Sequence, residues 1–519
     1  MLKGYRDRLK NAFGYKFIFL IFIAQCLIKG VCFVIFTEGM LPIFRNMGLD
    51  AIQIQVYGAV ALSPWTFKPL VGVLSDLIAI NGLHKKYAIL FACLLGISGS
   101  ICMVIGINIP VIMVLFLVFA HFQISVLDLL IEAKYAEKMR DHPETGSDIQ
   151  TLASGFQQAG FLIALSFVGP LADLQLFRVT SIIGLCLTVT PLLPVFFNWL
   201  PEVPIPNAPY ILLDTKQIRE NWRIITVVAV TGISAPAMAA IAAFAAKWLG
   251  LACASIVMVV VLIGGFLSMP HPIIARVALF QVLTQVSRVR FSSVLDFFFI
   301  ADPVCLPGGP NFSYKFYITT TGLAGCAASL STVFLYQYFL SKWKFRSVLI
   351  FTALLSGLGG IFDYIIVKRW NVPYIPDWIF FLIGDDVLSS VVDTLFYIPS
   401  ASIIGKVCPK GMESSTYAYL AGIANFGSMI SVITGALLAE IFGIKTTGVC
   451  NWDYLPMLLI VGHVICMLVI SIPASCLIPN VAQDADMLKT NPAPISGDDE
   501  NSGWESVEKD VLPLDDDFY

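Results

Sequence analysis

The chain has 519 residues, of which 57% are hydrophobic and 13% are charged, and its formal net charge at pH 7 is −3. A soluble domain has about 25% charged residues, so this composition excludes a water-soluble protein. The sequence also has no basic run outside short loops of the kind that neutralises phosphates, which excludes a nucleic-acid-binding protein. At about 20 residues per span, the length accommodates a dozen or more transmembrane helices.

The first apolar run, residues 17–41, follows a cluster of N-terminal cations. Signal peptides begin in a similar way, but this run is too long, carries Lys29 at its middle and lacks a cleavage site. We therefore interpret it as the first permanent span. The next apolar runs complete a first group of six predicted helices, at 52–80, 87–107, 109–136, 149–172 and 178–200.

A proline-rich polar segment then separates this group from the rest of the chain. Two further runs, at 224–246 and 248–269, are poor in polar side chains and predict a lipid-facing hairpin. Six more runs follow at 273–300, 315–340, 347–367, 377–403, 413–442 and 454–478. The predicted units are a six-helix bundle (1–200), a cytoplasmic linker (201–222), the hairpin (223–270), a second six-helix bundle (271–480) and a disordered acidic tail (481–519).

The distribution of Lys and Arg sets the predicted orientation, because these residues accumulate in cytoplasmic loops. With the N-terminus inside, the predicted cytoplasmic segments hold most of the cations and the outer segments hold few. Both termini are therefore predicted to be cytoplasmic, and the plasma membrane is the expected location. Of the 12 cysteines, only Cys305 and Cys450 fall in loops placed on the outer side, so these two are the candidate disulfide pair.

The predicted fold class is thus an all-α polytopic membrane protein with two six-helix halves and an extra hairpin. This is the plan of the major facilitator superfamily, in which the solute site lies between the halves near the membrane midplane. Charged residues inside spans are costly, and each is a candidate for a site or a buried pair. Four spans carry such residues at helical spacing, and they are the four that line the cavity in that fold. The stripes are Gln25, Lys29 and Cys32; His121, Ser125, Asp128 and Glu132; Gln281, Gln285, Arg288, Ser292 and Asp296; and Asp386, Ser390, Asp393 and Tyr397.

Two interpretations of these stripes stay open. They line a wet cavity that binds solute, or they form structural ion pairs between helices, such as Lys29 with Asp128. The candidate solute-binding residues are Lys29, Lys68, His121, Asp128, Gln285, Arg288, Asp386 and Asp393. Arg288 is expected to contact the solute or its counter-charge, whereas Arg290, about 200° round a continuous helix, cannot face the cavity equally well.

The link between the second and third spans holds a candidate gate. Its sequence, Gly72-Val-Leu-Ser-Asp76 followed by Gly82-Leu-His84-Lys85-Lys86, resembles the major-facilitator loop motif, in which a carboxylate and cations latch the cytoplasmic side. The alternative is that the cations serve only to orient the chain. The candidate gating residues are Asp76, Lys85, Lys86 and Glu413.

A longer motif narrows the family. Residues 64–76, Pro-Trp-Thr-Phe-Lys-Pro-Leu-Val-Gly-Val-Leu-Ser-Asp, resemble the P-W-x-x-K-P-L-x-G-x-x-S-D signature of the folate–biopterin transporter family. Gly384-Asp385 and Cys408-Pro-Lys-Gly-Met-Glu413 are similar to its G-D and C-P-x-G-M-E segments. The likeness runs from about residue 20 to residue 445. It implies secondary-active transport of folate, biopterin, a related pteridine or, in some members, S-adenosylmethionine.

The chemistry of the candidate residues suits these solutes. A carboxylate can accept the paired N–H groups of a pterin ring, and Lys29, Lys68, Arg288 and Arg290 can attract a folate glutamate tail. The expected partners are this small solute, the lipid bilayer and a coupling proton, with no cofactor. The rival classes are a channel and an intramembrane enzyme in which His121, Asp128 and Glu132 hold a metal. The enzyme is disfavoured because HExxH, GxSxG and phosphate-loop motifs are absent.

Overall fold

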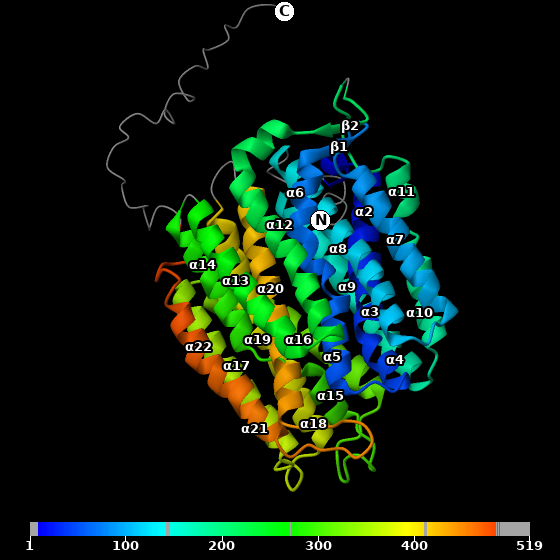
Figure 1. Cartoon of the computed structure of the whole chain (residues 1–519), viewed down its shortest axis with the longest axis vertical. Helices are drawn as coiled ribbons and strands as arrows, with labels where there is room; N and C mark the ends of the chain where they lie inside the picture. Colours follow the sequence, from blue (N-terminus) through cyan, green and yellow to red (C-terminus); the bar gives the residue numbers. More distant parts are fainter. Residues whose placement is uncertain are drawn as a thin grey trace, which may run out of the picture.

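The computed structural model of the protein describes residues 9–141, 146–206, 208–269, 271–408, 413–483, 485 and 487. Long helices run side by side in one bundle, and short helices and loops lie at its two ends (Figure 1). The end where helix α2 (Tyr15–Phe22) begins is here called the inner face, because it is predicted to be cytoplasmic. The opposite end is called the outer face.

The first group of predicted helices is present, with interruptions. The first span is a continuous run made of α2, the π-helical segment η1 (Ile23–Cys32), α3 (Phe33–Glu38) and α4 (Met40–Asn46). The later elements are α5 (Ala51–Ala61), α6 (Pro64–Leu77), α7 (Lys86–Ile105), α8 (Pro110–Asp141), α9 (Gly146–Asp173), α10 (Phe177–Thr188) and α11 (Leu192–Phe196). The predicted spans 52–80 and 178–200 are therefore each divided into two helices.

Helices α12 (Thr215–Phe244) and α13 (Lys247–Ser268) occupy the region of the predicted hairpin and pack against each other. Helix α12 starts at Thr215, with Asp214 capping the backbone N–H of Gln217, so the predicted linker to residue 222 is too long. It also packs against α6 and against α20 (Glu413–Ile441), a contact with both halves. That the pair is an insertion between two six-helix halves stays a prediction.

The remaining helices follow the predicted order. They are α14 (Pro272–Ser287), α15 (Ser292–Phe299), η3 (Lys315–Thr320), α16 (Thr321–Leu335), η4 (Tyr336–Leu340), α17 (Phe345–Val367), α18 (Asp377–Phe381), η5 (Leu382–Val387), α19 (Leu388–Lys406), α20, α21 (Leu455–Leu459), η6 (Ile460–Ile465) and α22 (Cys466–Ser475). At the inner face, strands β1 (Ile78–Ile80) and β2 (Ile211–Leu213) pair antiparallel, with Ala79 opposite Leu212. These short strands were not predicted.

Among the described residues, eleven helical runs are long and apolar enough to cross a membrane. This confirms an all-α polytopic membrane protein. The three predicted spans outside that set correspond to α5 with α6, to α14 with α15, and to the run from α18 to α19. The first two are interrupted, and the third carries Asp385, Asp386 and Asp393. These three predicted spans are thus the ones that are interrupted or carry several charges.

The prediction of one continuous helix over 273–300 is wrong, because the backbone leaves the helix between Arg288 and Phe291. The break leaves backbone carbonyls without their helical hydrogen bonds. Two side chains from other helices donate to these carbonyls instead. The Ser431 hydroxyl donates to the Arg288 carbonyl, and the Gln55 amide donates to the Arg290 carbonyl at 2.8 Å. Non-helical backbone at membrane depth is tolerated where such partners or a cavity satisfy it.

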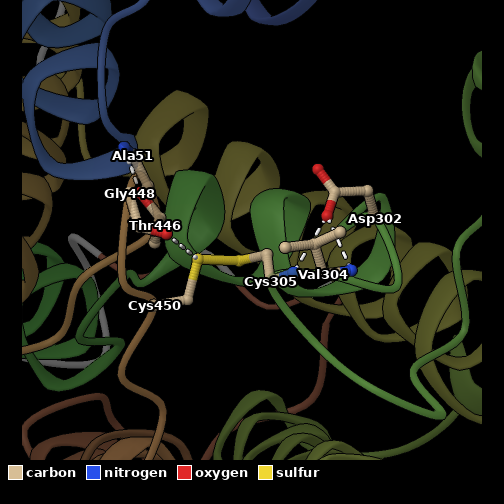
Figure 2. Close-up of a disulfide and its surroundings, with 7 residues drawn as sticks. All are labelled: Ala51, Asp302, Val304, Cys305, Thr446, Gly448 and Cys450. Atoms are coloured by element: carbon tan, nitrogen blue, oxygen red, sulfur yellow. Dashed lines mark hydrogen bonds between the residues drawn. A yellow bond between two sulfur atoms is a disulfide. The ribbon is translucent and has the colours of Figure 1, made fainter.

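A disulfide joins Cys305 to Cys450 at the outer face (Figure 2), which confirms the predicted pair. The loop that carries Cys450 also reaches the first half, because the Thr446 hydroxyl accepts the backbone N–H of Ala51 at 2.9 Å. The predicted tail begins later than residue 481, since Gln483 accepts a hydrogen bond from the Tyr336 hydroxyl at 2.6 Å and Met487 is fully buried. Most of the tail lies outside the described residues.

Candidate functional site

A central cavity of about 730 Å³ lies between the first and second groups of helices. The first group contributes residues of α3, α5 and α6, including Phe33, Gln55 and Trp65. The second group contributes residues of α15, η3, η5, α19 and α20. Small-molecule sites have volumes of roughly 300–1,000 Å³, so this cavity is large enough for an organic solute.

The charges that line the central cavity are mostly acidic. Among its described lining residues, the carboxylates are Glu38, Asp296, Asp385, Asp386 and Asp393, and the cation is Arg290. Asp386 and Asp393 lie on one helical run and line the central cavity, and their role in binding a solute stays a prediction. Oxygen Oδ2 of Asp386 is buried and has no hydrogen-bond partner among the described residues, so it can accept a donor from a solute.

Arg288 and Arg290 differ in a way that the sequence did not predict. Nη1 of Arg288 donates to Oδ1 of Asp393 at 2.6 Å, and its guanidinium lies 4.8 Å from the Phe396 ring centre. Arg288 lines a smaller neighbouring cavity, whereas Arg290 lines both cavities. Nε and Nη2 of Arg288 are buried without a hydrogen-bond partner, and the Arg290 guanidinium has no hydrogen bond or ion pair, among the described residues. The break in the helix thus corrects the expectation that Arg290 points away.

Four other charged residues of the first half, Lys29, Lys68, Asp128 and Glu132, form an ionic network, and none of them lines the central cavity. Nζ of Lys29 lies 2.7 Å from Oδ1 of Asp128 and 3.1 Å from Oε1 of Glu132. Nζ of Lys68 donates to Oδ2 of Asp128, and Gln25 donates to Oδ1 at 3.3 Å. Both oxygens of Asp128 are therefore occupied, and its side chain is only 1% exposed. This geometry favours the structural interpretation for Asp128, with Lys29 as one of its two cationic partners.

Two other predicted binding residues are placed away from the central cavity. His121 is fully buried and stacks on Phe33, with ring centres 5.9 Å apart, and neither of its ring nitrogens has a hydrogen-bond partner among the described residues. Gln285 packs near Gly427 of α20 and lines neither cavity. Within the described part of the chain, no group of three or more His, Cys, Asp or Glu side chains is placed to hold a metal ion.

The candidate gating residues lie together at the inner face. Nζ of Lys85 is 3.8 Å from Oδ1 of Asp76, and Nζ of Lys86 donates to Oδ1 of Asn198 at 2.6 Å. Glu202, which sequence reasoning missed, accepts the backbone N–H groups of Lys85 and Lys86 at 2.8 and 2.9 Å. A carboxylate at the start of α7 suits the positive end of its helix dipole. These contacts lie within the first half, and the side chain of Glu413 lies outside the described residues.

The same site contains residues that sequence reasoning had little cause to select. Glu38 is the last residue of α3, and it lines the central cavity. Asp363 of α17 and His463 of η6 lie on helices that were not expected to face a cavity, but both line the smaller one. A charged residue inside an apolar run was the available signal for Asp363 and His463.

Comparison with known proteins decides the family. The model of the BT1 family matches residues 29–494. The chain belongs to the BT1 family. Among related proteins of known name, the "Folate-biopterin transporter" of Synechocystis sp. is 21% identical over 450 residues, covering 82% of this chain and 77% of that protein. The "Probable folate-biopterin transporter 2" of Arabidopsis thaliana is 24% identical over 397 residues, covering 76% and 69%.

Solved transporter structures share the fold of this BT1-family chain. The POT family transporter PepTSo has a TM-score of 0.66 at 13% identity, covering 89% of this chain and 98% of PepTSo. The nucleoside transporter NupG has a TM-score of 0.54 at 15% identity, covering 89% of this chain and 96% of NupG. At these identities the likeness concerns the fold alone, and it agrees with the expected fold class of an all-α polytopic membrane protein.

Proposed function

We propose that this BT1-family chain is a secondary-active transporter that moves folate, biopterin or a related pteridine by alternating access. The alternative within the same class is S-adenosylmethionine or another polar organic solute. The observation that carries the proposal is the central cavity, where carboxylates, one open cation and aromatic rings line the space between two groups of helices. The names of the relatives support the pteridine class.

The cavity offers complementary groups for each part of a folate-like molecule. A pterin ring has adjacent N–H donors, which Asp386 or Asp393 can accept. Phe33 and Trp65, with ring centres 5.4 Å apart, can pack against the flat ring. Arg290 can bind a carboxylate of a glutamate tail, because its guanidinium donors have no partner among the described residues. Biopterin lacks that tail and needs only the carboxylate acceptor and the aromatic rings.

The acidic excess in the central cavity suggests how an anionic solute is accommodated. Five lining carboxylates and one lining arginine would repel a folate anion if all were ionised. We therefore propose that protons accompany the solute. We also propose that the protein lies in the plasma membrane with both termini cytoplasmic. At the inner face, we propose that Asp76 with Lys85 and Lys86 stabilises the closed state. We further propose that the chain has no enzymatic activity.

Counterflow in proteoliposomes tests the proposed function. The purified protein is reconstituted with unlabelled folic acid, biopterin or S-adenosylmethionine inside, and trace labelled solute is added outside. We expect saturable uptake of labelled folic acid or biopterin that depends on the matching internal solute. Counterflow of S-adenosylmethionine alone would replace the pteridine assignment with the alternative. A steady electrical current without saturable exchange would indicate a channel.

A further inference from the structure

A second cavity of about 400 Å³ lies beside the central one, within the second group of helices. It is lined where α14 and α15 are separated, and residues including Arg290, Ser292 and Asp296 line both cavities. Its far wall is made by α17 and η6, which do not line the central cavity. The second cavity is therefore adjacent to the proposed solute position but has a different wall.

A histidine–carboxylate pair forms part of this wall. Nδ1 of His463 lies 2.6 Å from Oδ2 of Asp363, and the Asp363 side chain is 9% exposed. Gly360 permits the approach, because a Cβ at that position would lie 2.7 Å from Cβ of His463. Gly462 similarly permits the ring of Phe291 to lie against η6. Two glycines thus let the helices approach closely where the pair meets the cavity.

The charges around the pair do not balance. The titratable and charged side chains lining the second cavity, from every element that forms it, are Arg288, Arg290, Asp296, Tyr317, Asp363, Asp385, Asp393 and His463. Even with His463 protonated, four carboxylates face three cations. Arg288 is already paired with Asp393, and Asp296 accepts a hydrogen bond from Tyr317 at 2.5 Å.

This pairing leaves Asp363 and Asp385 to share His463 and Arg290. When His463 is neutral, these two carboxylates face one cation, Arg290, and an excess buried negative charge is costly. One proton taken up by His463 or by one of the carboxyl groups removes this excess charge.

We propose that His463, Asp363 and Asp385 form a proton-binding site at the second cavity, with Asp385 in the wall shared with the central cavity, and that this site couples proton movement to transport. The proposal rests on the proposed transport function for its coupling role. One proton from cavity water binds to the cluster and is later released to water at the other face, so no bond within the solute changes. The bound proton removes one negative charge beside Arg290 and thereby favours an anion in the adjoining central cavity.

A solute-free measurement tests proton binding itself. Infrared difference spectra of the purified full chain are recorded between roughly pH 5 and pH 8, where a histidine-linked site titrates. We expect a carboxyl band that changes with pH in the wild type and is lost in Asp363→Asn. The matched control is Asp377→Asn, whose carboxylate pairs with Arg369 at 2.7 Å and lines neither cavity. A band unchanged in Asp363→Asn, or absent from the wild type, would overturn the site.

Transport by His463→Gln tests the coupling. Gln can keep a hydrogen bond to Asp363 but does not titrate, so a purely structural pair would tolerate it. With the membrane potential clamped, a pH gradient of one unit supports about tenfold accumulation when one proton moves with each solute. We expect this accumulation of folic acid or biopterin to be lost in His463→Gln, while counterflow, which needs no net proton movement, persists.

The outcomes separate the two proposals. Wild-type protein without counterflow of any tested solute contradicts the proposed function, while the infrared result still decides the proton site. Wild-type counterflow without pH-driven accumulation, or accumulation that survives in His463→Gln, overturns the coupling role. Protein abundance is measured beside both assays, with Asp377→Asn as the control for a general folding effect.

Discussion

At the residue scale, the charges around Asp128 have a different role from the charges at the central cavity. The carboxylate of Asp128 is buried and held by two lysines and Gln25, so it has no free acceptor for a solute. Asp386 has a free acceptor, and Arg290 has free donors, at the central cavity within the described part of the chain. Both groups show the same helical spacing in the sequence, and only the three-dimensional contacts separate a structural charge from one that is available for binding.

The first prediction concerns Asp128→Asn. The change leaves Lys29 and Lys68 without the carboxylate they share, and breaking a buried pair costs about 3–5 kcal/mol. We expect a strong loss of folded protein, measured as abundance in the membrane and as thermal unfolding in detergent. Adding Lys68→Met should restore part of the abundance. Asp76→Asn is the control, because the Asp76 carboxylate is 44% exposed and lies 3.8 Å from Nζ of Lys85, beyond hydrogen-bond distance. Normal abundance of Asp128→Asn would contradict the structural role of Asp128.

A second prediction compares the two neighbouring arginines. Arg290→Gln should reduce folic acid counterflow by about tenfold or more while sparing biopterin and abundance, because a charged hydrogen bond contributes roughly 1.5–3 kcal/mol. Arg288→Ala should instead lower abundance and the transport of every solute together, since it removes the partner of Asp393. Combining it with Asp393→Ala should restore some abundance. Equal effects of Arg290→Gln on folic acid and biopterin would remove its proposed role in anion binding.

The sequence was a good guide to which residues are unusual and a poor guide to their partners. Intramembrane charge alone selected Asp386 and Asp393, because the cost of burial makes such residues rare. Arg290 was ranked below Arg288 because a continuous helix places them on different sides. The break that brings Arg290 into the cavity depends on Ser431 and Gln55, which are 143 and 235 residues away in sequence. No local pattern contains that information.

At the scale of elements, three of the π-helical segments among the described residues contain an ionisable residue within a membrane helix. Segment η1 contains Lys29, η5 contains Asp385 and Asp386, and η6 contains His463. A π-helical turn is wider than an α-helical turn and rotates the residues that follow it, and such turns are frequent at functional sites. The spacing of polar residues at three and four positions therefore identified these helices. It did not predict the helix face on which each charged side chain lies.

The third prediction concerns a close contact between helices η1 and α9. A Cβ added to Gly160 would lie 2.7 Å from the Cα of Gly30, so Gly160→Ala must push the helices apart. We expect destabilisation of about 1–3 kcal/mol, the range for overpacking, seen as earlier thermal unfolding in detergent. Gly155→Ala on the same helix is the matched control, because its added Cβ meets nothing within 4 Å. Equal melting temperatures for the two variants would contradict this packing.

At the scale of the whole molecule, the first and second groups of helices meet beside the central cavity and at the outer face. Beside the cavity, the Asn425 side chain donates to the Trp65 carbonyl at 3.2 Å. At the outer face, Asp173 at the end of α9 accepts the backbone N–H groups of Tyr314 and Lys315 at 2.7 and 2.8 Å. Alternating access requires the contacts at one face to separate while those at the other hold, so Asp173 is placed to influence that balance.

The fourth prediction tests this outer contact with Asp173→Ala. Losing two charge-assisted hydrogen bonds should favour opening of the outer face. A cysteine introduced by Ser293→Cys, which lines the central cavity, should then react several-fold faster with a membrane-impermeant maleimide added at that face. The control is Asp302→Ala, because Asp302 accepts the N–H groups of Val304 and Cys305 within its own loop (Figure 2). Unchanged labelling in Asp173→Ala would exclude the proposed influence.

The overall architecture was more predictable than its interruptions. The order of the helices follows from the strong requirement that a membrane helix be long and apolar, which eleven runs among the described residues meet by themselves. The divided helices, the β1–β2 pair and the close contact of His463 with Asp363 depend on neighbours that are distant in sequence. These same features shape the two cavities, so the functional centre is the part that the sequence describes least well.

The disulfide between Cys305 and Cys450 makes the intervening chain a covalent ring. The ring contains α16, α17, α19 and α20, so a protease cut between η4 and α17 would leave two fragments joined, separable on a gel only after reduction. Because the two cysteines flank these helices, the ring can close only after the chain has been synthesised as far as Cys450 and both loops share an oxidising compartment. Its presence on a non-reducing gel would therefore identify molecules whose second half has reached its final arrangement in the membrane.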